Sequence, residues 1–134
     1  MKKDPLSTQH INGQALIEFV LILPIILLFA AMILDMGRVV FYKTSLTNAV
    51  REGARYGIVH PDDCSGINDT VRHFAFGVTP DEVTCGKVND GKDIQVWASI
   101  TFTPATPFGH MIMGSEDGMT LKSYSVMEIE SNGP

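Results

Sequence analysis

One long apolar run dominates the N-terminal third of the chain. From Ala15 to Leu34, about 20 residues contain a single charge, which is long enough to cross a bilayer core of roughly 30 Å. Apolar residues occur all round this predicted helix, which favours a membrane span over the core helix of a soluble protein. Two residues are unexpected in such a run. A charge such as Glu18 costs about 2.5–3.5 kcal/mol at the centre of a span, and Pro24 removes a backbone hydrogen bond, so it is either a static kink or a point of local bending.

An amphipathic pattern follows the apolar run and predicts that the helix continues beyond the membrane. Polar side chains recur every four residues, at Lys43, Thr47, Arg51 and Arg55. The opposite face is apolar and consists of Val39, Tyr42, Leu46, Ala49, Val50 and Gly53. Gly57 and Pro61 predict the end of the helix. A helix from Gln14 to Ile58 is about 65 Å long at 1.5 Å per residue, so its outer half needs a partner for its apolar face.

Charge pairs and small residues add detail to this outer half. Asp35 with Arg38 and Glu52 with Arg55 are opposite charges three residues apart, a spacing that favours ion pairs on a helix. Gly53 and its neighbours are small enough for close packing against another element. The alternative is that these glycines only weaken the end of the helix.

The remaining residues predict a small mixed head. Ile67, Val71, Phe74 and Ala75 keep helical spacing, and Gly77 is a candidate helix end. Residues 82–88, 94–102 and 121–129 predict three strands, the second with the clearest alternation of apolar and polar positions. The stretch from Asn89 to Lys92 is a turn signal between the first two strands. The fold class is therefore α+β, with a long N-terminal helix packed on a small antiparallel sheet.

Charge and cysteine content narrow the partners and the compartment. The chain has a net charge of −5, divided into +2 through Ile58 and −7 beyond it, and an acidic head argues against nucleic acid as a partner. The basic residues lie just past the span, where membrane lipid attracts them. Cys64 and Cys85 both follow the span and predict a disulfide in an oxidising compartment. Lys and Arg counts alone favour a cytoplasmic head, so the two signals for topology disagree.

Other chemistry is poorly supported by the sequence. His60, Cys64, His73 and Cys85 match no zinc spacing, and an oxidised cysteine pair cannot bind zinc as thiolates. We therefore predict no metal, no cofactor and no enzymatic activity. Asn68 begins a glycosylation sequon, a triplet common by chance. The apolar stretch from Phe108 to Met113 is either a contact patch for another subunit or a plug for the core.

A short polar leader precedes the apolar run and resembles a known processing signal. It ends in Gly13, and the chain continues Gln14-Ala15-Leu16-Ile17-Glu18, so cleavage after Gly13 makes Glu18 the fifth residue. This arrangement resembles the class III signal of type IV pilins, which a prepilin peptidase processes on the cytoplasmic face of the inner membrane. Such proteins keep the apolar helix and place the head outside, which agrees with the cysteines.

The resemblance extends along the helix to a specific family. The stretches G-Q-A-L-I-E-F-V-L-I-L-P, L-D-M-G-R-V-V-F-Y and L-T-N-A-V-R-E-G-A-R-Y-G are similar to the TadE-like family, minor pilins or pseudopilins of the tight-adherence (Tad, or Flp) pilus system. The resemblance covers roughly Gly13 to Val59. Its motif residues in the outer helix are Asp35, Gly37, Arg38, Asn48, Arg51, Glu52, Gly53 and Arg55. Phe19 and the long head favour the minor-pilin branch over the major pilin, and Gln14 departs from the usual Phe or Met.

The resemblance implies a layout and a role. Residues 1–13 are the leader, 14–34 the span, 35–59 the outer helix and 60–134 the head. In pilins, a carboxylate placed like Glu18 meets the N-terminal amine of a neighbouring subunit, which offsets the cost of a lone charge in lipid. The simpler interpretation is that Glu18 lies one turn into the span and reaches the interface. The leading hypothesis is a single-pass inner-membrane subunit of a Tad pilus; the alternative is an anchored binding domain that never enters a filament.

Overall fold

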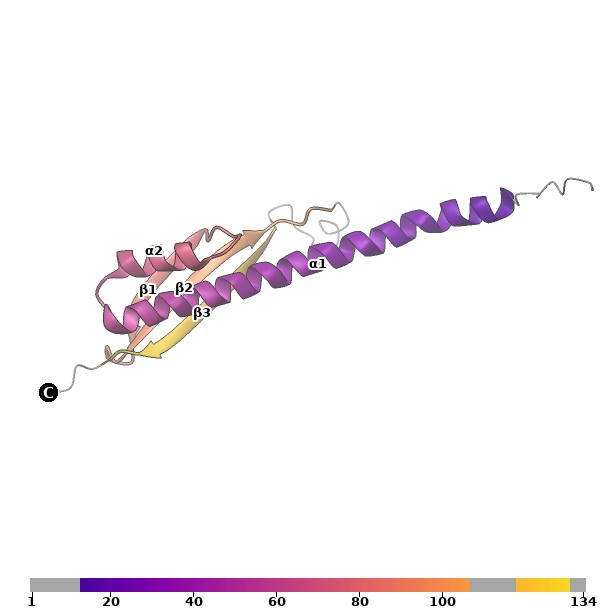
Figure 1. Cartoon of the computed structure of the whole chain (residues 1–134). Coiled ribbons are helices and arrows are strands. Elements are labelled where there is room, and N and C mark those ends of the chain that lie inside the picture. Colours follow the sequence, from indigo (N-terminus) through magenta and orange to yellow (C-terminus); the bar gives the residue numbers. More distant parts are fainter. Residues whose placement is uncertain (1–12, 107–117, 131–134) are drawn as a thin grey trace, which may run out of the picture.

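A single long helix runs through most of the length of the described structure and into the head. The computed structural model describes residues 13–106 and 118–130, and α1 runs without a break from Gly13 to Val59, a length of 47 residues. Its N-terminal half extends away from the rest of the chain, and its C-terminal half carries the head (Figure 1). Pro24 lies within the continuous helix. The α+β fold with a long helix packed on a small antiparallel sheet is confirmed.

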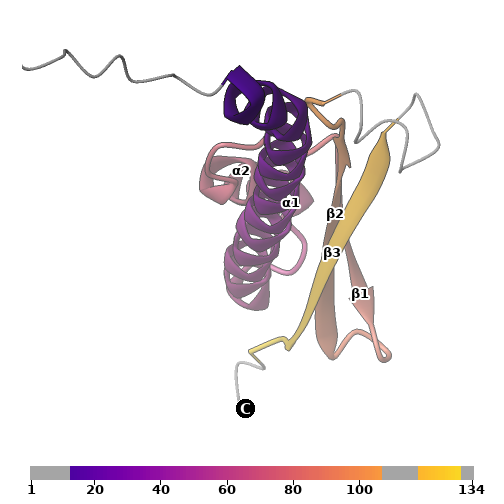
Figure 2. The same cartoon turned by 90° about the vertical axis from the view of Figure 1, so that its right-hand side faces the viewer.

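The head consists of one more helix and three strands. These are α2 (Cys64–Phe74), β1 (Glu82–Val88), β2 (Asp93–Phe102) and β3 (Met119–Glu128). The strands form an antiparallel sheet in the order β1-β2-β3. Both helices lie on one face of this sheet (Figure 2). The predicted strands are all present, β1 with the expected bounds and β3 beginning two residues earlier.

The predicted turn joins β1 to β2. Asn89 and Asp90 have φ values of 52° and 56°, the left-handed region that Asn and Asp adopt more readily than most residues. The amide of Gly91 donates to the carbonyl of Val88 at 3.2 Å, which closes the turn. The turn sets the register in which Val88 faces Asp93, and so places the apolar side chains of β2 on the helix side of the sheet.

The core lies between the helices and the sheet. Alternate residues of β2 from Ile94 to Phe102 are buried, as their alternation predicts. The outer helix contributes Leu46, Ala49, Val50 and Ala54, all with no exposed surface. The predicted apolar face of the outer helix therefore packs on the head, because only the sheet and α2 can remove it from water.

The predicted short helix is present, and the structure gives its bounds. It begins at Cys64, where Asp63 caps it by accepting a hydrogen bond from the amide of Gly66 at 3.0 Å. It ends at Phe74, before Gly77. Ile67, Val71 and Ala75 are buried as their spacing predicts, but Phe74 is half exposed and lies outside the core. The predicted apolar stretch from Phe108 to Met113 lies outside the described residues.

Candidate functional site

The first half of α1 presents an apolar surface with one carboxylate. Among the described residues, α1 is the one helix long and apolar enough to cross a membrane. Its side chains from Leu16 to Leu34 stand clear of the head, and Ile33 and Leu34 are about 70% exposed. Glu18 lies on this exposed part, and the described residues give it no ion pair. A long apolar surface of this kind is consistent with a single-pass membrane anchor.

The head contacts the helix directly beyond this apolar half, at Asp35. The carboxylate of Asp35 accepts hydrogen bonds from the amide of Ala105 at 3.2 Å and the hydroxyl of Thr106 at 2.5 Å. Arg38 lies 3.7 Å from the same carboxylate. The guanidinium also lies over the rings of Tyr42 and Phe102, an arrangement that favours a cation. The predicted Asp35–Arg38 pair is therefore part of a junction between the helix and the segment that follows β2.

Further contacts attach the middle of α1 to the head on two sides. The hydroxyl of Ser45 donates to the carbonyl of Phe76 at 2.7 Å, which attaches the α2–β1 connection to the helix. On the other side, Thr47 and Ser123 share a hydrogen bond of 2.9 Å, and Lys43 donates to the carbonyl of Lys122. The predicted polar stripe therefore divides into two parts: Lys43 and Thr47 contact β3, whereas Arg51 and Arg55 face solvent.

Two glycines of the outer helix, Gly53 and Gly57, allow close packing of the head against α1. A Cβ atom added to Gly53 would lie 2.4 Å from Cγ2 of Val71, and one added to Gly57 would lie 3.0 Å from Cγ1 of Ile94. By contrast, a Cβ atom at Gly37 would meet nothing within 4 Å. Of the two interpretations of Gly53, close packing is the one that the geometry favours. The predicted ion pair between Glu52 and Arg55 is also present, at 3.6 Å on the exposed side.

Covalent and polar links hold α2 at the far end of the head. Cys64 and Cys85 form a disulfide between the first residue of α2 and the middle of β1, with Cα atoms 5.9 Å apart. The amide of Gly66 and the hydroxyl of Tyr56, 2.9 Å away, hold the pKa of the Asp63 carboxyl below its usual range. Within residues 13–106 and 118–130, no group of histidine, cysteine and acidic side chains has the geometry of a metal site.

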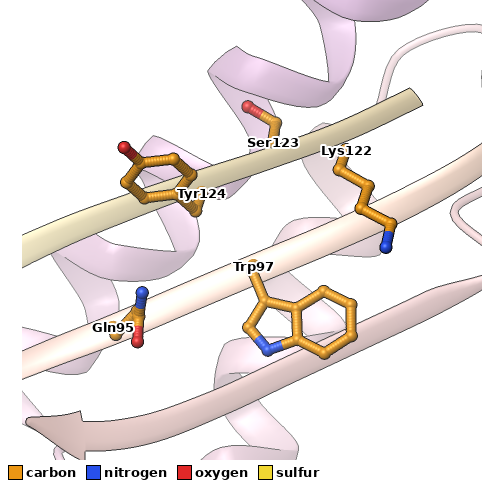
Figure 3. Close-up of a pocket in the computed structure, with 5 residues that line it drawn as sticks. All are labelled: Gln95, Trp97, Lys122, Ser123 and Tyr124. Carbon is orange, nitrogen blue, oxygen red and sulfur yellow. The ribbon is translucent and has the colours of Figure 1, made fainter.

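The sheet face opposite the helices carries two aromatic side chains, of which Tyr124 is exposed and Trp97 is partly buried. Trp97 and Tyr124 are directly opposed on β2 and β3, and Tyr124 is 71% exposed. With Gln95 and Lys122 they line a shallow cleft of about 300 Å³ on the side of the sheet away from α1 (Figure 3). The sequence placed Trp97 on the polar side of its strand but gave no sign that the two rings share a surface, because the register of β3 was unknown.

One comparison with known proteins gave a match, and it falls on α1. Residues 13–55 match the family model described as TadE-like protein. The match supports a TadE-like protein. It covers most of α1, and the matched range contains the positions from Asp35 to Arg55 that we named as motif residues of the outer helix. Searches of curated proteins and of solved structures gave no match.

The TadE-like match and the apolar helix together support a Tad-type pilin-like protein. The TadE-like family is structural and not enzymatic, and it suggests association with a membrane and with pilus subunits. The segment after Arg55, which includes α2 and the whole sheet, lies outside the match. The contacts of Asp35 with Ala105 and Thr106 join the TadE-like helix to this second segment, and the sequence carried no signal for them.

Proposed function

We propose that this chain is a minor pilin or pseudopilin, a membrane-stored subunit that helps to prime, cap or decorate a Tad pilus or a related secretion machine. The observation that carries the proposal is the TadE-like match over a helix whose first half stands free of the head. A helix that served only as an anchor needs no carboxylate in its apolar half. A subunit that moves from membrane to filament has a use for one.

Glu18 is the residue that we propose drives association. Cleavage by a prepilin peptidase between Gly13 and Gln14 frees an amine, and the carboxylate of Glu18 pairs with that amine on a neighbouring subunit. The pairing offsets the cost of a charge in lipid, so the stored subunit is biased towards assembly. Phe19 and Pro24 belong to the same segment, and Pro24 offers a point of bending when the helix leaves the bilayer.

The proposed topology places the leader in the cytoplasm and the head outside. The Cys64–Cys85 disulfide supports this orientation, because disulfides persist in oxidising compartments. The subunit is stored in the inner membrane with residues 14–34 as the span, and its proposed partners are lipid, the prepilin peptidase and other pilin-like subunits.

A series of substitutions at Glu18 tests the proposal. Glu18→Ala removes both the insertion cost and the proposed ion pair. The variant should therefore insert and be cleaved at least as well as wild type, yet fail to support pili. Glu18→Gln keeps the shape without the charge and should also be impaired, whereas Glu18→Asp should be intermediate. The assay is pilus yield at matched membrane levels of the protein.

Intact-mass analysis of the membrane-extracted protein provides the control for processing, since a mature chain beginning at Gln14 is expected in every variant. Normal pili from the alanine variant would refute the role of Glu18. A wild-type chain that keeps its leader in cells with active peptidase would refute the processing step.

The alternative function is an anchored binding domain that never enters a filament. The cleft between Trp97 and Tyr124 is the observation that favours it, because aromatic side chains on an open sheet face are common at binding surfaces. This alternative predicts normal pili in all three Glu18 variants, together with a loss of ligand binding when Trp97 is replaced.

A further inference from the structure

A groove without charged residues lies between α1 and the end of α2. The groove has a volume of about 200 Å³. It is lined by Phe41, Thr44, Ser45, Asn48, Phe74 and Phe76. Phe41 and Phe74 are about half exposed, and Phe76 is 81% exposed. Three neighbouring phenylalanines in contact with water are unusual on a head that is otherwise strongly acidic, and such patches mark interaction surfaces.

The groove is held in shape by contacts on its floor. Ser45 donates to the carbonyl of Phe76, so the α2–β1 connection is attached to α1 next to the exposed ring. Gly77 follows with a φ of +72°, a left-handed conformation that glycine adopts without strain. A Cβ atom at Gly77 would lie 3.1 Å from Cζ of Phe41, so the connection passes close over that ring. These contacts hold the backbone that carries Phe76 against α1, so this part of the groove needs little backbone ordering to bind a partner.

The groove continues a stripe that runs up from the apolar half of α1. The members of this stripe are exposed and lie alternately three and four residues apart. They are Leu34, Gly37, Phe41, Thr44 and Asn48. This spacing keeps residues on one side of a helix and is the pattern of helix–helix seams. Asp35 and Arg38 lie off the stripe and bond to each other and to the head. An uncharged strip therefore passes from the proposed span into the groove.

Height above the bilayer decides between lipid and protein as the occupant. Thr44 and Asn48 lie 10 and 14 residues beyond Leu34, which places them about 15 and 21 Å above the hydrocarbon boundary at 1.5 Å per residue. The headgroup layer is only about 5–8 Å thick on each side, and an ordinary tilt of about 20° changes these heights little. Lipid covers the stripe up to Gly37 but cannot fill the groove.

We propose that the groove binds the helix of a second, different pilin-like subunit that runs parallel to α1 from the same membrane. This inference rests on the proposed function and adds to it the contact surface and the kind of partner. A partner anchored with the same topology lies parallel and follows the stripe out of the bilayer. Its helix is apolar or small opposite Phe41 and Thr44.

Charge argues that this partner is not a second copy in register. The stripe continues at the same spacing to Arg51 and Arg55, both exposed. Two copies in register would oppose these arginines to each other, which is unfavourable. Arg55 pairs with Glu52 on its own helix, whereas the described residues give Arg51 no ion pair. The partner therefore carries an acidic side chain opposite Arg51.

Site-specific photocrosslinking in cells that assemble pili tests the proposal. A photoreactive residue at Asn48 should form an adduct with a second membrane protein that has a single N-terminal apolar helix. The matched control is the same residue at Tyr124, which is 71% exposed on the opposite face of the head and should give no such adduct. Phe76→Ser should lower the Asn48 adduct roughly tenfold or more, the size of effect expected for a central aromatic contact, and Tyr124→Ser should not.

Further variants make the charge argument testable. Arg51→Glu should lower the adduct, and changing the facing acidic residue of the partner to lysine should restore it. Formation of the Cys64–Cys85 disulfide in each variant shows that the head is folded.

Several results would overturn the proposal. An adduct between two copies of this chain would show that the partner is not a different subunit. An adduct with lipid alone, or equal yields from Asn48 and Tyr124, would show that the groove binds no helix. Loss of pili in Glu18→Ala without any Asn48 adduct would leave the proposed function standing and refute the groove. An Asn48 adduct that persists while Glu18→Ala makes normal pili would support the groove and refute the proposed role of Glu18.

Discussion

Replacing Gly53 by alanine sets helix propensity against packing at the contact between α1 and α2. Gly53 is fully inside the interface, and an added Cβ atom would lie 2.4 Å from Cγ2 of Val71. Carbon atoms in contact prefer about 3.5–4.0 Å, so the new methyl group overlaps its neighbour by more than 1 Å. Val71 is β-branched, helical and without exposed surface, so it cannot rotate away.

The two opposing effects can be compared in magnitude. Alanine is better than glycine within a helix by about 0.8–1.0 kcal/mol. Overpacking a tight core costs about 1–3 kcal/mol, and the upper part of that range applies here because the disulfide at Cys64 limits how far α2 can move away. We expect a net destabilisation of about 1–2 kcal/mol, which lowers the midpoint of thermal unfolding by roughly 4–8 °C per kcal/mol for a head of this size.

Two further variants isolate the contact. Gly37→Ala is the matched control, because a Cβ atom at Gly37 meets nothing within 4 Å, and it should stabilise the helix by about 0.8–1.0 kcal/mol. Val71→Ala alone should destabilise the head, whereas the double variant with Gly53→Ala should be more stable than the two effects predict together. The new methyl group then fills the space that Val71 has left, a coupling that a double-mutant cycle measures.

Unfolding of the full chain in detergent can be followed by the fluorescence of Trp97, the single tryptophan. A higher midpoint for Gly53→Ala, equal to that of Gly37→Ala, would refute the packing argument. Additive effects of Gly53→Ala and Val71→Ala would refute it as well. Either result would favour the alternative that Gly53 only weakens the end of α1.

The other predictions concern the links that hold α2. Replacing Cys64 and Cys85 by serine removes a disulfide between residues 21 positions apart. The free energy of unfolding should fall by about 3 kcal/mol in the chain-entropy model. Denaturant titration measures this change, and an unchanged midpoint would contradict the prediction. The Gly66 amide and the Tyr56 hydroxyl lower the pKa of Asp63 in the folded protein. The charged carboxylate therefore stabilises the fold at any pH above the ordinary aspartate pKa of about 3.9. This stabilisation is lost as the pH falls through the lowered pKa of the folded state. Asp63→Asn keeps a capping side chain without the charge, so its stability deficit at neutral pH should shrink in acid. A deficit that is independent of pH would show that the charge plays no part.

Local patterns were enough to predict the elements of this fold. The apolar run and the amphipathic pattern predicted one continuous helix from Gln14 to Ile58, one residue short of the observed helix at each end. Both patterns depend only on residues a few positions apart. Alternation along β2 predicted its buried side, and the Asn89–Asp90–Gly91 sequence predicted the turn before it. The TadE-like motif also lies in one uninterrupted segment, which is why the resemblance could be read from the sequence. The position of the disulfide followed from there being two cysteines.

Tertiary structure decided what these elements do to each other. The contact of Asp35 with Thr106 joins residues 71 positions apart, and no local pattern encodes it. Phe74 keeps the spacing of a core residue, yet its side chain is half exposed and lines the groove beside α1. The exposed groove of Phe41, Phe74 and Phe76 arises from three segments that meet only when the α2–β1 connection is attached to Ser45. Sequence determines which residues prefer water or lipid, but the surface that they form depends on which segments the packed core brings together.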